Sequence, residues 1–333
     1  MDSLLKPNGS GRTLEDVTRL GYQIPNFTYP GVAPARLFDT IRQQAVEAEE
    51  SGFDTVLVMD HFYQLAGLGR PDQEMIECYT LLSALAQHTS RVRLSSLVTG
   101  NTYRHPSLLA KTVTALDIVS GGRAQLGIGA GWFELEHDSL GFEFGTFTDR
   151  FERLEESLRI VLPMLRGERP TLDGKWYQVH DAMNFPAPLS RIPVMIGGGG
   201  ERKTLRMVAQ YADESNLICA VEDIPRKLEA LAGHCANLGR DRSEITVSYQ
   251  TSACIAPTHE QAVAEFEAYL ERQPEAEARR ATAIVGDPDE VAEQYAKLRD
   301  TGIDGVTVNA PPNGHVEGRV ALLGRALAPL FTA

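Results

Sequence analysis

The sequence predicts a (β/α)8 TIM barrel, an α/β fold built as one domain with insertions at its carboxyl-terminal face. A short apolar run, a loop of glycine and polar residues, and a stretch of helical period recur about eight times along the chain. Most of the runs are continuously apolar, which is typical of parallel strands buried on both faces. So many strand–helix units in one chain favour a closed barrel over an open doubly wound sheet, which is the alternative.

The elements are expected in a regular order. Strands are predicted at residues 20–25, 55–59, 92–98, 124–128, 193–196, 214–219, 245–255 and 305–309. Amphipathic helices are predicted between them, at residues 37–51, 79–89, 108–120, 151–165, 203–211, 224–238, 259–272 and 289–301. Glycines support these helix ends, because Gly52, Gly121, Gly122 and Gly302 follow predicted helices at positions where a left-handed residue commonly ends a helix.

One domain accounts for residues 19–333, and residues 1–18 are expected to form a polar amino-terminal extension. Longer connections follow the second strand (residues 61–75) and the fourth strand (residues 129–150). In a barrel both lie at the carboxyl-terminal face, where active sites are built. These loops are therefore the expected insertions.

Charge and composition narrow the partners of the chain. A formal net charge of −13 disfavours nucleic-acid binding, which depends on a basic surface. No run approaches the roughly eighteen apolar residues of a membrane span, and the amino terminus has no apolar leader, so we expect a cytoplasmic protein with no membrane partner. The cysteines lack CxxC spacing, and neither HExxH nor HxH occurs, so we expect buried free thiols and no metal site at Cys78, Cys219, Cys235 and Cys254.

The stretch from residue 194 to residue 206 is the most informative of the chain. An apolar run breaks into the tetraglycine segment, residues 197–200, and a helix is expected to open directly afterwards. Backbone without Cβ atoms allows a ligand close approach, and a helix start offers unpaired N–H groups and the positive end of its dipole. The segment therefore predicts an anion site, with local positive charge from Arg202, Lys203 and Arg206 or else a merely solvated basic face.

Residues suited to chemistry end three other predicted strands. His61 follows Asp60 at the end of the second strand, where a histidine can donate or accept a proton near neutral pH. Hydroxyl and amide groups in residues 95–102 suit the edge of a heterocycle, and small residues before Trp132 allow a flat ligand to lie against the backbone. The structural alternatives are a hydrogen-bonded loop histidine, a capped turn and an aromatic core.

In order and spacing, these segments resemble the luciferase-like monooxygenase superfamily, specifically its coenzyme F420-dependent oxidoreductases of actinobacterial type. The matching stretches are residues 23–26, 58–64, 99–106, 116–123, 127–137 and 150–156, the tetraglycine segment with its helix, and residues 285–291. The resemblance implies a luciferase-like barrel with the cofactor ring at the carboxyl-terminal face, and a homodimer.

The resemblance also implies a set of site residues. Asp60 and His61 become the catalytic candidates, with His61 near the hydride-carrying carbon of the ring as proton donor or charge stabiliser. A non-prolyl cis peptide bond is implied at about Ser96-Leu97. The implied cofactor-binding residues are Ser96, Leu97, Thr99, Gly129, Ala130, Gly131, Trp132, Gly197, Gly198, Gly199, Gly200 and Glu201.

The leading hypothesis is an oxidoreductase that transfers a hydride between reduced coenzyme F420 and a small organic substrate. The alternatives are an FMNH2-dependent monooxygenase that uses molecular oxygen, with FMN as cofactor, and a non-catalytic flavin-binding protein. The chain departs from the resemblance at one position, because some sugar-phosphate-oxidising relatives carry a glutamate in place of Trp132.

Overall fold

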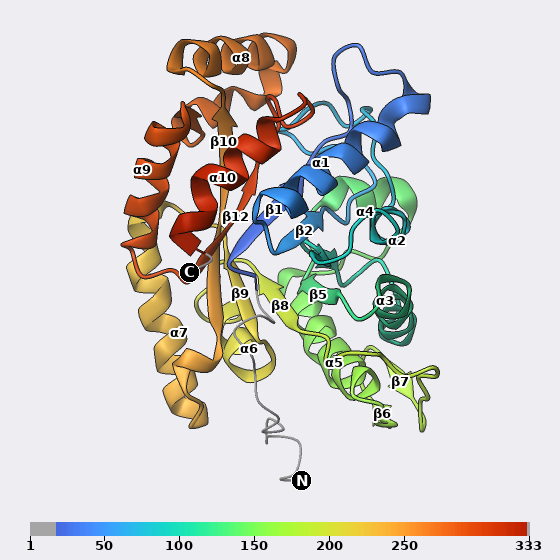
Figure 1. Cartoon of the computed structure of the whole chain (residues 1–333). Helices are drawn as coiled ribbons and strands as arrows, with labels where there is room; N and C mark the ends of the chain where they lie inside the picture. The colour runs from blue at the N-terminus through green and yellow to red at the C-terminus, as the bar shows by residue number, and fades with distance from the viewer. Residues whose placement is uncertain (1–17, 332–333) are drawn as a thin grey trace.

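The computed structural model describes residues 18–331, whose main strands close into one parallel barrel (Figure 1). β1 pairs with both β2 and β12, and the pairing of β9 with β10 completes the ring. The predicted (β/α)8 barrel is confirmed. Its strands are β1 (Leu20–Ile24), β2 (Thr55–Val58), β3 (Arg93–Ser96), β5 (Ala124–Gly129), β8 (Val194–Gly197), β9 (Glu214–Leu217), β10 (Thr246–Ile255) and β12 (Gly305–Asn309).

Helices surround the barrel, and each predicted helix is present, three with the predicted bounds and the others with shifts at one or both ends (Figure 1). They are α1 (Leu37–Ser51), α2 (Cys78–Ala86), α3 (Pro106–Ser120), α5 (Phe147–Leu165), α6 (Thr204–Tyr211), α7 (Ile224–Leu238), α8 (His259–Arg272) and α9 (Pro288–Arg299). Short elements lie outside this alternation: β4 (Thr99–Gly100), β11 (Ile284–Gly286), the hairpin of β6 (Leu172–Asp173) and β7 (Gln178–Val179), and the 3-10 turns η2 (Pro34–Arg36), η3 (Val221–Asp223), η4 (Arg242–Glu244) and η5 (Pro274–Ala281).

Two further helices were not predicted. α10 (Arg319–Phe331) packs against α1 and α9 and buries an apolar stripe that includes Leu323 and Leu327. α4 (Glu134–Leu140) has an inverted pattern, because it buries Glu136 and His137 while Leu135 is 43% exposed. A pattern of apolar positions cannot reveal a helix that buries its polar side chains.

Local chemistry explains the shifted helix ends. α5 begins four residues earlier than predicted because Thr146 and Asp149 form a capping box, in which each side chain accepts a hydrogen bond from the backbone of the other. α6 begins at Thr204 rather than directly after the tetraglycine segment, since residues 201–203 form a turn. The helix predicted at residues 203–211 therefore begins one residue later than expected, and a turn separates it from the glycines.

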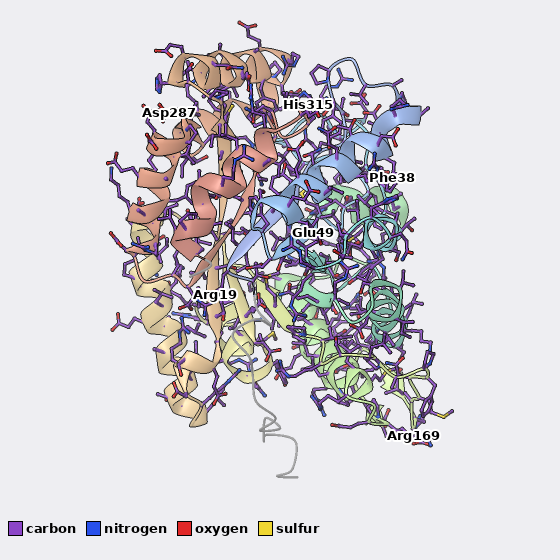
Figure 2. The ribbon with its side chains drawn as sticks, viewed as in Figure 1. Arg19, Phe38, Glu49, Arg169, Asp287 and His315 are labelled. Carbon is purple, nitrogen blue, oxygen red and sulfur yellow. The ribbon has the colours of Figure 1, made fainter. Side chains whose placement is uncertain are left out.

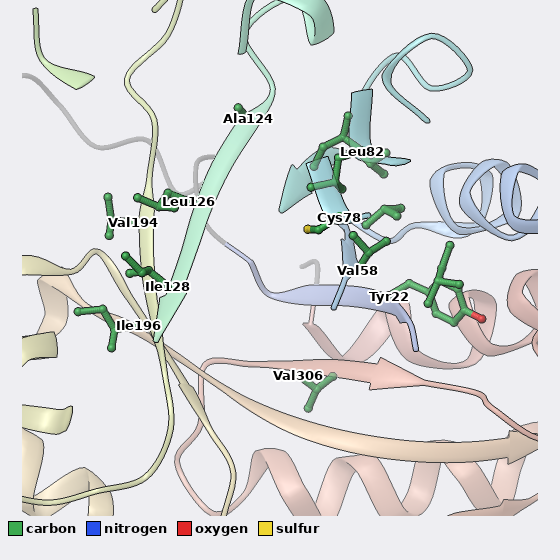
Figure 3. Packing of buried hydrophobic residues seen from close by; sticks show 14 of the residues in the cluster. Tyr22, Val58, Cys78, Leu82, Ala124, Leu126, Ile128, Val194, Ile196 and Val306 are labelled. Carbon is green, nitrogen blue, oxygen red and sulfur yellow. The ribbon is translucent and has the colours of Figure 1, made fainter. Parts of the chain in front are cut away.

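The two faces of the barrel sheet differ in chemistry. Outward-facing side chains pack against the helices, as Val58 does near Cys78 and Leu82 of α2 (Figure 3). Inside the barrel, Gln23 accepts hydrogen bonds from Gln250 at 3.0 Å and from Asn309 at 2.8 Å. Directional polar contacts thus replace much of the branched apolar packing usual in such barrels.

Thr18, the first described residue, lies at the amino-terminal end of the barrel, here called the barrel floor. Residues 1–17 of the predicted extension lie outside the described part of the chain, but Thr18 is buried. Its backbone N–H donates to Glu214 at 3.1 Å and its hydroxyl donates to Gln125 at 3.1 Å. Thr18 is thus joined to the strands of the barrel.

The cysteines are free thiols, buried as predicted except for Cys219, which is partly exposed after β9. Of the helices that the structure describes, none combines the length and apolar character needed to cross a membrane.

Candidate functional site

His61 lies just beyond β2 with its ring held on one side. Its Nδ1 is 2.9 Å from a carboxylate oxygen of Glu136, and 12% of the His61 side chain is exposed. The rings of Trp132 and Phe133 meet the imidazole edge-on, with centroid distances of 5.9 and 5.6 Å. The other ring nitrogen, Nε2, has no partner among the described residues and is the atom left for a ligand.

Glu136 is wholly buried, and its carboxylate accepts hydrogen bonds from several directions. Besides His61, the backbone N–H groups of Phe62 and Tyr63 donate to Oε1 at 2.5 and 2.9 Å, and the Tyr103 hydroxyl donates to Oε2. Burial acts to raise the pKa of Glu136, but the hydrogen bonds and the His61 charge outweigh it and hold that pKa below its ordinary value. An ionised Glu136 therefore fixes the orientation of His61 and keeps a proton on its Nδ1.

Asp60 has a different environment from that of its neighbour. Its carboxylate receives two hydrogen bonds from Arg104, at 2.6 and 3.0 Å, and one from the backbone N–H of Gly100 at 3.2 Å. Burial raises the pKa of Asp60 above its ordinary value, although the Arg104 guanidinium opposes this rise. Arg104 also pairs with Glu77 at 2.6 Å. Asp60 is thus engaged in an ion pair that joins β2, β4 and α2, and its predicted catalytic role stays a prediction.

The chain bends after β3. The non-prolyl cis peptide bond lies between Leu97 and Val98, one residue later than the position implied by the resemblance. Ser96 donates to the Gly127 carbonyl at 2.8 Å, and Thr99 bonds to both Ser96 and Tyr79, at 2.7 and 2.6 Å. Because Ser96 and Thr99 are fully buried with these partners, they hold the bend, and their contact with a cofactor stays a prediction.

Val98, just after the bend, joins three strand ends. A Cβ atom on Gly129 would lie 2.9 Å from one methyl group of Val98, and a Cβ on Gly197 would lie 2.9 Å from the other. The ends of β5 and β8 therefore approach the bend as closely as they do because both residues are glycine. This contact connects the tetraglycine segment to the strand end that precedes Trp132.

Large apolar side chains stand exposed where β5 and β9 end. Trp132 follows Ala130 and Gly131 and is 62% exposed, and Ile218 is 63% exposed. β8, which leads into the tetraglycine segment, pairs with both of these strands. Exposed apolar groups on either side of a glycine backbone suit a flat ligand that covers them.

The tetraglycine segment offers backbone donors. Gly198 donates its N–H to Asn216 and has a φ of +115°, where a side chain would be strained. Among the described residues, no hydrogen-bond acceptor receives the backbone N–H groups of residues 199–203. Successive unpaired N–H groups before a helix form an anion-binding site, so the residues present fit a phosphate-bearing cofactor.

The charged residues after the glycines are mostly paired. Glu201 accepts hydrogen bonds from Arg226 and from Lys227, the latter at 2.8 Å, so its carboxylate is committed to α7. Arg206 pairs with Glu155 of α5 at 2.9 Å. Lys203 lies over the rings of α5, and Arg202 is exposed before the helix. The proposed contact of Glu201 with a cofactor therefore needs its backbone N–H rather than its carboxylate.

The roles of Glu136, Tyr103 and Arg104 were missed from the sequence. Glu136 lies within the matching stretch of residues 127–137, but nothing in the sequence pattern gave it a role. Its signal is an acidic residue on the buried face of a short helix, which becomes visible once the helix is placed. Across residues 18–331, the structure shows no cluster of three His, Cys, Asp or Glu residues able to hold a metal ion.

Related sequences cover most of the chain. The family model described as luciferase-like monooxygenase matches residues 18–305. A relative from Rhodococcus erythropolis, named F420-dependent glucose-6-phosphate dehydrogenase, is 30% identical over 322 residues, with 87% of this chain and 92% of the relative covered. A relative of the same name from Microbacterium testaceum is 28% identical over 324 residues, covering 89% and 92% of the two chains.

Solved structures share the fold at lower sequence identity. The coenzyme F420-dependent tetrahydromethanopterin reductase from Methanopyrus kandleri has a TM-score of 0.72 and 20% identity, covering 94% of this chain and 99% of that one. An F420-dependent secondary alcohol dehydrogenase has a TM-score of 0.75 and 18% identity, covering 92% and 99%. With its closed barrel and a family match that spans most of its length, the chain belongs to the luciferase-like monooxygenase family.

Proposed function

We propose that this protein is a coenzyme F420-dependent oxidoreductase that transfers a hydride between the reduced deazaflavin and a small organic substrate. The observation that carries the proposal is the meeting of two features at one end of the barrel: His61 held by Glu136, and the tetraglycine segment with its unpaired N–H groups. The names of the two relatives support the choice of cofactor, since both are called F420-dependent dehydrogenases.

When bound, coenzyme F420 supplies the hydride-carrying ring. The tetraglycine segment and the N–H groups of residues 199–203 are the groups that would hold its phosphate. Trp132 and Ile218 provide apolar walls for the ring. These backbone N–H groups would provide local positive potential for the phosphate, which matters because the chain as a whole has a formal net charge of −13.

His61 would handle the proton. Glu136 occupies Nδ1, so a proton enters or leaves the imidazole at Nε2. The buried carboxylate also stabilises the positive charge of a doubly protonated ring. In this arrangement Glu136 is a positioning residue, and His61 is the catalytic residue that faces the ligand.

The walls of the site favour a substrate with an apolar part. Trp132, more than half exposed, places an indole where some sugar-phosphate-oxidising relatives carry a glutamate. We therefore propose a small organic substrate other than glucose 6-phosphate. Turnover of glucose 6-phosphate and of other small organic substrates, measured with the reduced and the oxidised cofactor, tests this point. Efficient oxidation of glucose 6-phosphate would contradict it.

Titration of the purified protein with coenzyme F420 and with FMN tests the cofactor. We expect coenzyme F420 to bind tightly and to change its absorption spectrum, with FMN much weaker. Tight binding of FMN without binding of coenzyme F420 would instead assign the chain to the FMN-dependent monooxygenases.

The variant His61→Ala tests the proton role. We expect turnover to fall by about a hundredfold or more, the usual worth of a positioned acid or base, while the Kd for coenzyme F420 is unchanged. His180→Ala, at an exposed histidine after β7, is the matched control and should retain full activity. Full activity in His61→Ala would remove the assigned role.

A further inference from the structure

A cavity separate from the site described above lies at the carboxyl-terminal end of the barrel. It has a volume of about 140 Å3 and is enclosed by the loop after β1, the end of α8 and the segment after β12. Figure 2 labels His315, one of its lining residues, high in the view, and Arg19, which directly precedes β1, much lower. None of the residues assigned above to the cofactor or to the proton role lines this cavity.

One part of the cavity wall is apolar. Tyr29 and Tyr269 line it together with the adjacent Pro311 and Pro312. The Tyr29 ring is stacked on His315, with a centroid distance of 5.2 Å and an interplanar angle of 19°. An apolar cavity of about 150 Å3 accepts benzene, so there is room here for one small ring or a branched hydrocarbon.

Hydrogen-bond donors line the same space. The Arg272 guanidinium has no hydrogen bond or ion pair with another described residue, and its charge acts on both His315 and Tyr269. Asn26 is 8% exposed, and its side-chain amide also has no partner in the described part of the chain. The described residues that line the cavity include no aspartate or glutamate.

His315 adds a third donor. Its Nδ1 is closed off from solvent and has no hydrogen-bond partner within residues 18–331. Burial lowers the pKa of His315, and the charge of Arg272 lowers it further. The Glu265 carboxylate, which pairs with Arg319, acts in the opposite direction. Burial and Arg272 therefore favour the neutral ring, and its proton is assigned to Nε2, because a buried N–H on Nδ1 without a partner is costly.

We propose that this cavity is a binding site for a small organic monocarboxylate. The carboxylate would accept hydrogen bonds from Arg272, Asn26 and His315, and the hydrocarbon part would pack against the tyrosine and proline walls. The site offers a single cation, which matches one negative charge. Inorganic phosphate carries more charge at pH 7 and has no apolar part to fill the walls, so it fits less well.

Calorimetric titration of the full chain with benzoate, benzamide and inorganic phosphate tests the proposal. We expect benzoate to bind, and both benzamide and phosphate to bind at least about tenfold more weakly, because a hydrogen bond to a charged group has roughly that worth. Arg272→Gln should weaken benzoate binding by about tenfold or more, while Arg325→Gln, at an exposed arginine of α10, should leave it unchanged.

Two further measurements complete the test. His315→Phe keeps a ring to stack on Tyr29 but removes the donor, so it should weaken benzoate severalfold. The affinity of Arg272→Gln for coenzyme F420 should equal that of the unaltered chain, which separates this site from the proposed function. Benzoate affinity that is unaffected by Arg272→Gln, tighter binding of phosphate than of benzoate, or no benzoate binding would each overturn the proposal.

Discussion

At the scale of single residues, the site depends on a buried carboxylate that is fully satisfied. A charge inside a protein is costly unless hydrogen bonds replace its water, and Glu136 obtains these from His61, Tyr103 and two backbone N–H groups. His61 is recognisable in the sequence, because a histidine directly after a strand has a characteristic position. Glu136 is not, because its contact with His61 joins residues that are 75 positions apart.

The variant Glu136→Gln tests this arrangement. A glutamine has no charge to stabilise a protonated His61 and presents an amide donor toward groups that also donate. We expect kcat to fall by about tenfold to a hundredfold, as for other groups that orient a catalytic side chain, with the Kd for coenzyme F420 unchanged. Glu134→Gln, at an exposed position of the same helix, should have no effect. An unaltered kcat in Glu136→Gln would show that His61 needs no such support.

At the scale of elements, the expected and observed boundaries differ where side chains act on the backbone. The Thr146 and Asp149 capping box lengthens α5, and the turn after the tetraglycine segment shortens α6. Hydrophobic periodicity places the middle of a helix well and its ends poorly, because the caps are made by polar contacts. The inverted α4 shows the same limit for a whole element.

A glycine replacement separates the binding role of the tetraglycine segment from its role in folding. Gly198→Val places a branched side chain at a φ of +115°, which distorts the segment, so we expect both stability and coenzyme F420 affinity to fall. Gly239→Val, at a φ of +65° after α7 with no atom near the added Cβ, should lower stability but leave cofactor affinity unchanged. Equal cofactor affinity in the two variants, measured by titration, would return the segment to a purely structural role.

At the scale of the whole molecule, the alternation of strands and helices was enough to predict the barrel. Its polar interior was not foreseen, because residues such as Gln23 and Asn309 acquire partners only when distant strands close around them. The same closure buries Glu214 in the barrel floor. Burial is the largest cause of a rise in the pKa of Glu214 from 4.5 to about 7, and the charges of Asp54 and Asp213 add to it. The hydrogen bond from the Thr18 N–H opposes this rise.

This shift predicts a pH dependence of stability. The folded chain holds the Glu214 proton more tightly than the unfolded chain does, so the stabilising contribution is present below pH 4.5 and is lost as the pH rises to about 7. Glu214→Gln cannot ionise, and its stability relative to the unaltered chain should increase between pH 5 and pH 8. Urea unfolding at both pH values measures this difference.

The matched control for the pH dependence is Glu229→Gln, at an exposed glutamate of α7. Its stability relative to the unaltered chain should be the same at both pH values. A constant difference for Glu214→Gln as well would mean that Glu214 does not titrate in this range.

The contact of Val98 with Gly129 and Gly197 has an evolutionary consequence. Each methyl group of Val98 fills the volume that a side chain on one of these glycines would need. Substitutions at these positions should therefore be epistatic. Gly129→Ala should lower stability when residue 98 is valine and should be tolerated when it is combined with Val98→Ala. A double-mutant cycle would measure this dependence. Within the family, we expect larger residues at either glycine position to occur together with a smaller residue at the position of Val98.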